Sequence, residues 1–164
     1  MKTQKRRRRE HKTDYLKRIK LLKSRSPRIV FRKTNRYVIA QYVETREAQD
    51  RVVFGMNSKK LIDYGWPKEL KNSLKSLPAA YLLGVVAGKK IIKEKLKTPI
   101  LDLGMIRTVH KTKIYAFLKG IVDSGIEIKH KKSIFPEEEK IKGKNLKKDF
   151  SKTFDKIKSK IESL

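Results

Sequence analysis

The chain has 164 residues, enough for one globular domain with tails, and its 44 Lys and Arg residues against 17 Asp and Glu give a net charge of +27. Such a charge repels itself in a compact body, and a polyanionic partner, nucleic acid above all, would offset that repulsion. The lack of cysteine excludes disulfides, thiolate catalysis and Cys-ligated zinc or iron–sulfur sites.

The distribution of apolar residues argues against membrane insertion and secretion. Hydrophobic residues make up 38% of the chain, which is enough to build a core. The basic run Lys5 to Arg9 is followed by charged residues, whereas a secretory signal continues into an apolar segment. The most apolar stretch, Ala79 to Gly88, is too short to span a bilayer. We therefore expect a soluble protein of the cytoplasm.

The N-terminal segment, residues 1–12, is strongly basic and almost without apolar side chains. Such a segment cannot offset its ordering entropy by burial, so it is predicted to form a flexible basic arm. Thr13 or Asp14 then caps a short helix that runs to about Lys23. Its apolar residues share one face, namely Tyr15, Leu16, Ile19 and Leu22. Basic residues crowd the other face, namely Lys17, Arg18, Lys20 and Lys23.

Three runs rich in β-branched and aromatic residues follow the helix. They lie at Arg28 to Thr34, Arg36 to Glu44 and Arg51 to Met56. Asn35 suits a tight turn between the first two runs. We predict that the three runs form an antiparallel meander.

The middle of the chain alternates helices and strands. The predicted elements are a short helix at 58–64 capped by Asn57 or Ser58, a loop at 66–77, a helix from Pro78 to about Lys97, a strand from Ile100 to Leu103, a helix at 112–124 and a short strand from Ile126 to Ile128. Gly84 and Gly88 have the spacing of a small-residue packing motif, which predicts close contact between helix and sheet. A meander continued in this way predicts an α/β fold with a mixed sheet, similar to the ribonuclease-H-like arrangement.

The chain ends in a lysine-rich helical extension, residues 129–164, which follows the α/β domain at 13–128. Pro136 begins a helical turn with Glu137 to Glu139 at its positive end, and Gly143 ends it. An apolar stripe with helical spacing follows, made of Leu146, Phe150, Phe154, Ile157 and Ile161. This stripe is predicted to pack on the chain's own core or on RNA, with a neighbouring protein as the alternative.

Residues suited to catalysis are not clustered in this sequence. A two-metal nuclease on a ribonuclease-H-like fold needs grouped carboxylates, but Asp102 stands alone on the fourth strand. The first strand carries Arg28, Arg32 and Lys33 and no acid. The three histidines are far apart and lack a metal-ligand spacing. We therefore expect a protein that is not an enzyme and holds no metal or cofactor, and a Mg²⁺-dependent nuclease is the less favoured alternative.

Basic residues are concentrated in the first 36 positions, on the arm, one helix face, a loop and the first hairpin. Guanidinium groups bind phosphate bidentately and stack on bases, and an aromatic or amide side chain among them can contact unpaired bases. The candidate RNA-binding residues from this pattern are Arg6, Arg7, Arg8, Arg9, Arg18, Lys20, Lys23, Arg25, Arg28, Arg32, Lys33, Asn35, Arg36 and Tyr37. A nuclear-import signal or a general DNA-binding patch is the alternative interpretation.

The segment KTDYLKRIKLLKSRSPRIVFRKTNRYVIAQ, residues 12–41, resembles universal large-subunit ribosomal protein eighteen in its archaeal/eukaryal-type form. Similarity continues at PAAYLLGVVAGKK (78–90), LDLG (101–104), LKGIVDSGIEIKH (118–130) and FPEEEKIKG (135–143), so that it covers about residues 10–145. The chain departs from the family at RTVHKTK (107–113), which lacks an expected glycine, and at Lys129, which replaces an expected proline. The tail after Asn145 does not match the family.

The resemblance implies a non-catalytic core and a structural role in the large ribosomal subunit. The family binds 5S rRNA and helps to anchor it to the large-subunit rRNA in the central protuberance, beside neighbouring ribosomal proteins. The RNA contacts implied for this chain are Lys12, Thr13, Tyr15, Arg18, Lys23, Arg28, Arg32, Lys33, Asn35 and Arg36. No membrane and no small-molecule substrate is implied. A general nucleic-acid-binding protein stays the alternative.

Overall fold

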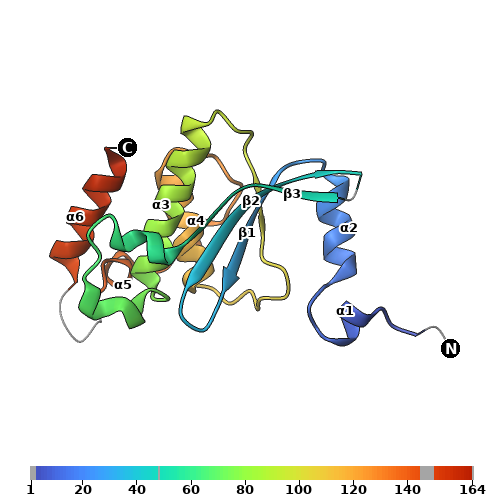
Figure 1. Cartoon of the computed structure of the whole chain (residues 1–164), viewed down its shortest axis with the longest axis horizontal. Coiled ribbons are helices and arrows are strands. Elements are labelled where there is room, and N and C mark those ends of the chain that lie inside the picture. Colours follow the sequence, from blue (N-terminus) through green and yellow to red (C-terminus); the bar gives the residue numbers. More distant parts are fainter. Residues whose placement is uncertain (1–2, 48, 145–149, 164) are drawn as a thin grey trace.

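A four-stranded mixed sheet lies at the centre of the fold, with the strand order β3-β2-β1-β4. The strands are β1 (Arg28–Lys33), β2 (Val38–Arg46), β3 (Gln49–Asn57) and β4 (Ile100–Asp102). The first three pair antiparallel and β4 runs parallel to β1. The computed structural model describes residues 3–47, 49–144 and 150–163 (Figure 1). The predicted meander and the α/β fold class are confirmed.

The β1–β2 hairpin follows from alternation and a short polar turn. Val38, Ala40 and Tyr42 alternate along β2 and are fully buried, because every second side chain of a strand faces the core. The turn between the strands is closed by Thr34, whose N–H and hydroxyl both donate to the carbonyl of Tyr37 at 2.8 Å. This is the turn that Asn35 predicts.

Strands β2 and β3 continue beyond the sheet as a two-stranded ribbon (Figure 1). The pairing extends to Arg46 opposite Gln49, after a register shift at Tyr42/Val43. Strand β3 therefore begins two residues earlier than its predicted start at Arg51. The ribbon reaches the region where the N-terminal helix lies, and it supplies an acid to that region, as described below.

Two helices cross each other closely beside the sheet: α3 (Leu77–Lys93) and α4 (Lys113–Asp123). A Cβ atom at Gly84 would overlap the carbonyl oxygen of Phe117, and one at Gly120 would overlap the carbonyl oxygen of Tyr81. The glycines therefore permit the two helices to approach each other closely. The prediction of close contact between helix and sheet is wrong, because Gly84 packs against helix α4. Helix α3 also ends four residues before the expected Lys97, where the Leu96 N–H bonds to the carbonyl of Ile91 at 3.0 Å.

Short elements join these parts. They are the 3₁₀ helices η1 (Ser58–Ile62), η2 (Lys68–Ser73) and η3 (Lys132–Ile134). Asn57 caps η1 by accepting from the Lys59 N–H at 2.7 Å, and η2 occupies part of the predicted loop. The predicted last strand, Ile126 to Ile128, is wrong. Ile126 is buried in the core, but its backbone pairs with no strand in the part of the chain that the structure describes.

The C-terminal extension packs on the domain through α5 (Glu138–Lys142) and α6 (Ser151–Glu162). Phe154, Ile157 and Ile161 are buried along one face of α6. The Phe150 ring lies 4.6 Å from the Trp66 ring, measured between centroids. The predicted apolar stripe thus covers the chain's own core, while Leu146 lies outside the described residues. Within the described ranges, no helix has both the length and the hydropathy needed to cross a bilayer.

The N-terminal helices, α1 (Arg6–Arg9) and α2 (Tyr15–Lys23), lie at the end of the ribbon, away from α3 and α4 (Figure 1). Neither helix contains a buried residue. Leu16 and Ile19 of the predicted apolar face are 66% and 49% exposed, whereas Tyr15 and Leu22 of the same face are half-buried. Helix α1 lies where no element was predicted, and the flexibility of the arm stays a prediction.

Removal of residues 1–12 is expected to leave the cooperative thermal unfolding of the domain unchanged, because helix α1 buries no side chain. Circular dichroism during heating measures this. A shortened chain that unfolds without a cooperative transition would show that the arm is part of the folded domain.

Candidate nucleic-acid interface

The arm folds back onto the start of helix α2. The Arg7 carbonyl accepts from the N–H groups of Lys12 and Thr13 at 2.9 and 3.2 Å, and the Arg7 Nε donates to the Thr13 hydroxyl at 2.9 Å. Asp14 caps the helix, accepting from the N–H groups of Leu16 and Lys17 at 3.0 and 3.2 Å. Three of the predicted contact residues, Arg7, Lys12 and Thr13, are thereby brought together.

A chain of ion pairs joins α2 to the sheet. Asp50 on β3 accepts from Arg18 at 3.0 Å and from Arg28 at 2.6 Å. Arg28 also donates to Asp102 on β4 at 3.0 Å. The second Asp102 oxygen lies 3.8 Å from a nitrogen of Arg32. We call these five residues the ion-pair chain. It links one helix and three strands and fixes the positions of three of the predicted arginines.

Arg28 differs from the other predicted contact residues. Its side chain is 4% exposed, and its guanidinium group is held by Asp50, Asp102 and the hydroxyl of Thr45. A buried charge is tolerated only when it is paired in this way. Arg28 therefore supports the surface from within, and its predicted direct contact with RNA is incompatible with this burial.

Strand alternation explains how the ion-pair chain forms. Arg28 and Arg32 are four residues apart on β1, so they lie on the same face of the sheet, opposite to the core residues Ile29 and Phe31. The parallel register places Asp102 opposite Val30, between the two arginines. The role of Asp102 was missed in the sequence analysis. The sequence feature that could have indicated this role is a single acid on β4, which pairs with a strand, β1, that carries two arginines.

Burial alone would raise the pKa of Asp50, but hydrogen bonds from Thr45, Arg28 and Arg18 outweigh burial and hold this pKa below the ordinary 3.8. A depressed folded-state pKa contributes stability that is present above the unfolded value and lost as pH falls through the folded value. We expect the thermal midpoint to fall below about pH 4 in the native chain, and to fall less in Asp50→Asn. Circular dichroism during heating measures both midpoints. An equal fall of the thermal midpoint at low pH in both proteins would contradict the role of Asp50.

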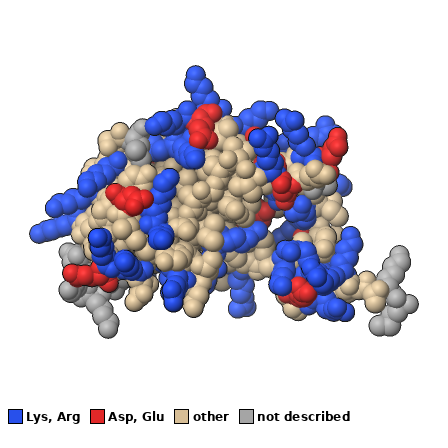
Figure 2. Space-filling model, in the orientation of Figure 1, with Lys and Arg blue, Asp and Glu red and all other residues tan. Residues whose placement is uncertain are grey.

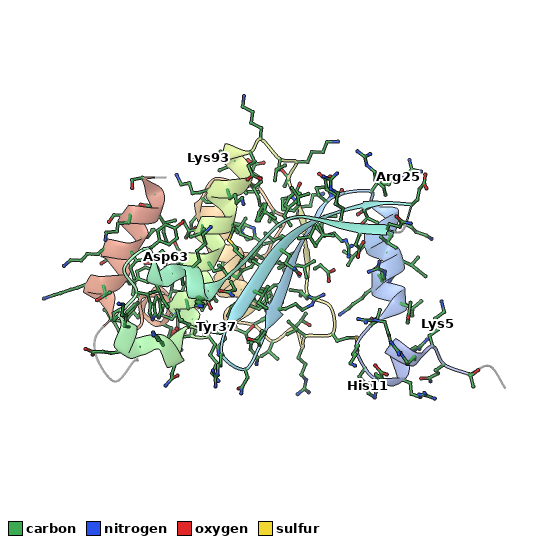
Figure 3. All side chains as sticks on the ribbon, viewed as in Figure 1. Lys5, His11, Arg25, Tyr37, Asp63 and Lys93 are labelled. Carbon is green, nitrogen blue, oxygen red and sulfur yellow. The ribbon has the colours of Figure 1, made fainter. Side chains whose placement is uncertain are left out.

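The hairpin turn presents a second group of predicted residues. Asn35 and Arg36 are exposed, and the ring of Tyr37 is half-buried against the core. Figure 3 shows Tyr37 at the hairpin turn, at some distance from Lys5 and His11 near helix α1. The turn and the arm are thus separate contact points on one molecule, joined by strand β1.

Lys33 belongs to a third group that was not fully predicted. Burial, followed by the charges of Lys33 and Lys75, lowers the pKa of Lys113 at the start of α4. The same region holds a pocket lined by Lys33 and Lys113 together with apolar side chains such as Phe31. Lys75 and Lys113 were missed because only folding brings them to Lys33. Like charges gathered here favour an anionic partner.

Other predicted residues do not join these groups. Arg25 lies at the far end of α2 from Lys5 and His11 (Figure 3). The adjacent pocket contains Arg25 together with Glu47. Lys20 and Lys23 are exposed on α2. Arg6, Arg8 and Arg9 are exposed on α1.

Acidic side chains neutralise the two ends of the molecule to different degrees. Glu137, Glu138 and Glu139 each form an ion pair with a lysine near α5. In the described part of the first 36 residues the acids are Glu10 and Asp14, among many more Lys and Arg residues. Figure 2 shows Lys and Arg gathered densely over the end of the molecule that carries α1. This end therefore has the larger surplus of positive charge.

A metal-dependent site is not formed by the described residues. They contain no group of three or more His, Asp or Glu side chains placed to hold a metal ion. Asp102, the acid considered for a nuclease, is instead bonded to Arg28 and to the Gly104 N–H at 2.8 Å.

This chain is similar in sequence to known proteins over most of its length. Residues 1–99 match the family model described as ribosomal large subunit proteins 60S L5 and 50S L18. The large ribosomal subunit protein uL18 of Korarchaeum cryptofilum (strain OPF8) is 45% identical over 141 residues, which cover 86% of this chain and 70% of that protein.

Proposed function

Because this chain belongs to the family of ribosomal large-subunit proteins that comprises 60S L5 and 50S L18, we propose that it binds 5S rRNA through its N-terminal basic surface. The family membership itself makes the chain a structural protein of the cytoplasmic ribosome, with rRNA and ribosomal proteins as partners, and not an enzyme. The similarity to an archaeal relative agrees with the archaeal-type form that the sequence resembles.

The arginine-rich end of the molecule is the observation that carries this proposal. Arg6 to Arg9 are exposed on α1, and the ion-pair chain fixes Arg18 and Arg32 beside them. Contacts of this kind to phosphate position a nucleic acid without reading its sequence. The arm adapts its conformation to the RNA as it binds.

The hairpin turn supplies the second part of the proposed contact. Unpaired bases in RNA loops stack on aromatic rings and bond to amide side chains. Tyr37 and Asn35 offer these groups beside Arg36, at a distance from the arm. Two separate contact points recognise the shape of a folded RNA better than one continuous charged strip does.

We further propose that the protein anchors 5S rRNA to the large-subunit rRNA in the central protuberance. Exposed lysines on the opposite end, such as Lys152, Lys156 and Lys160 on α6, support this role (Figures 1 and 2). They leave a basic surface available while the N-terminal end is occupied.

A filter-binding titration of the full chain against 5S rRNA and against duplex DNA of equal length tests the proposal. We expect affinity for 5S rRNA to fall steeply as salt rises, because phosphate neutralisation releases condensed counterions. We also expect 5S rRNA to be preferred over the duplex at physiological salt. Affinity that does not change with salt would overturn the proposal. Equal affinity for the two nucleic acids would favour a general nucleic-acid-binding protein instead.

A further inference from the structure

Four residues of the ion-pair chain, Arg18, Arg28, Arg32 and Asp102, line a pocket between the arm, helix α2 and the loop after β4. Its volume is about 160 Å³. Six basic side chains line it, namely Arg7, Lys12, Lys17, Arg18, Arg28 and Arg32. We call this the basic pocket. The arm, α2 and β1 each contribute a cation, so the pocket exists only when the three segments meet.

Arg32 is fixed more firmly than an ordinary surface arginine. Its Nη1 donates to the carbonyls of Phe31 at 2.8 Å and Asp102 at 3.2 Å. Its Nη2 lies 2.9 Å from the position that a Cβ on Gly104 would occupy, and Gly104 has a φ of +55°. The guanidinium group thus lies directly over a residue that has no side chain. Its side chain is still 42% exposed and able to contact a ligand.

The charge of the basic pocket is only partly balanced by acids. Asp102 pairs with two lining cations, Arg28 at 3.0 Å and Arg32 at 3.8 Å. Asp50 pairs with Arg18 at 3.0 Å, and Glu10 pairs with Lys12 at 2.9 Å. Asp14 is the remaining acid in the lining, so six lining cations stand against four acids and a positive surplus remains. Positive groups held together in a concave, partly enclosed site favour the binding of a compact anion.

We propose that the basic pocket binds a single phosphate group, and that Asp102 and Gly104 are positioning residues that hold Arg32 in it. The identity of the ligand as a backbone phosphate of RNA rests on the proposed function. The Nε and Nη2 groups of Arg32 do not donate to the carbonyls that its Nη1 contacts and suit two phosphate oxygens, and Lys12 and Lys17 supply point charges around them.

The effect of Asp102→Asn on RNA affinity is expected to be opposite to the effect that charge alone predicts. Asp102→Asn removes a negative charge, so simple electrostatics predicts tighter binding of a polyanion. If Asp102 positions Arg32, the same substitution weakens binding, because the guanidinium loses its carboxylate partner. Gly104→Ala alters no charge, yet the added methyl group would displace Arg32 from its place.

Binding of 5S rRNA by the full-length variants, measured across salt concentrations, tests these roles. We expect Arg32→Gln, Asp102→Asn and Gly104→Ala each to weaken binding by about tenfold, and to reduce the salt slope by about one. Asp63→Asn is the matched charge control, on an exposed acid far from α1 and α2 (Figure 3). Gly65→Ala, at a φ of +103°, is the matched control for backbone strain. Both controls should bind within twofold of the native chain.

A loss of folding has to be separated from a loss of positioning. Asp102→Asn leaves the buried Arg28 with one of its two carboxylate partners, Asp50, which destabilises the fold. Arg28→Met added to Asp102→Asn removes that partly compensated charge. We expect this double variant to regain thermal stability while RNA binding stays weak. Recovery of native affinity together with stability would overturn the positioning role of Asp102.

Inorganic phosphate tests the pocket without RNA. At constant ionic strength, exchanging chloride for phosphate should raise the thermal midpoint of the native chain more than that of Arg32→Gln. An equal rise in both proteins, or tighter RNA binding by Asp102→Asn, would overturn the phosphate pocket. The proposed binding of 5S rRNA would survive either result, since its own test is the affinity and salt dependence of the native chain.

Discussion

Replacing Arg6, Arg7, Arg8 and Arg9 together with glutamine is expected to weaken the binding of 5S rRNA by about 100-fold at 0.15 M salt. All four side chains are exposed on helix α1, and they belong to the end of the molecule with the largest surplus of positive charge. The salt slope should fall by about three, because each phosphate contact to a single strand contributes about 0.7. Filter binding across a salt series measures both quantities.

A matched variant distinguishes a specific surface from total charge. Four exposed lysines near the opposite end are replaced by glutamine, which gives the same change in net charge: Lys68, Lys152, Lys156 and Lys160. This variant should bind isolated 5S rRNA within about threefold of the native chain. Equal losses in both variants would mean that net charge, rather than the N-terminal surface, determines affinity.

Gly84→Ala is expected to lower the stability of the fold strongly. The added Cβ would overlap the Phe117 carbonyl oxygen, which is backbone and cannot rotate away. Helices α3 and α4 must then separate, and overpacking of this kind costs about 3 kcal/mol. For a chain of this size the thermal midpoint should fall by about 6–12 °C. Differential scanning calorimetry measures the change.

Gly55→Ala is the control for the loss of a glycine. A Cβ at Gly55 would lie 3.5 Å from Gln41, which is an ordinary contact with a side chain. Its thermal midpoint should stay within about 2 °C of the native value. If Gly84→Ala were equally mild, the close crossing of α3 and α4 would not be the feature that fixes these helices.

The parts of the fold with strong local signals were predictable from the sequence. Alternation along β2, the turn at Asn35 and the stripe on α6 each encode their element locally, and the structure confirms them. The strand at Ile126 to Ile128 was wrong because two isoleucines on either side of Glu127 suit a short strand and a partly buried loop equally well. The sequence window alone does not reveal whether a pairing partner is present.

The candidate site was predictable only in part. Clustering of arginine in the first 36 residues identified the charged end of the molecule. Which of these arginines is buried depends on tertiary contacts. Arg28 and Arg32 look alike in the sequence, but the Arg28 side chain is buried and the Arg32 side chain is exposed. The partners Asp50 and Asp102 lie 22 and 74 residues from Arg28, beyond any local pattern.

Helix α2 shows the same limit in another form. Its apolar and basic faces were recognised, but amphipathic spacing does not state which face meets the domain. The structure attaches α2 through Arg18, an ionic contact, and leaves Leu16 exposed. The Arg18–Asp50 ion pair, across 32 residues of sequence, therefore fixes one point of the helix that its own spacing does not reveal.

Cross-linking of the full chain to 5S rRNA, followed by mass spectrometry of the linked peptides, tests the central claim most directly. We predict that linked peptides come from residues 3–37, with the arm and the hairpin turn both represented. Links confined to α5 and α6, with none in the arginine-rich N-terminal segment, would contradict the account.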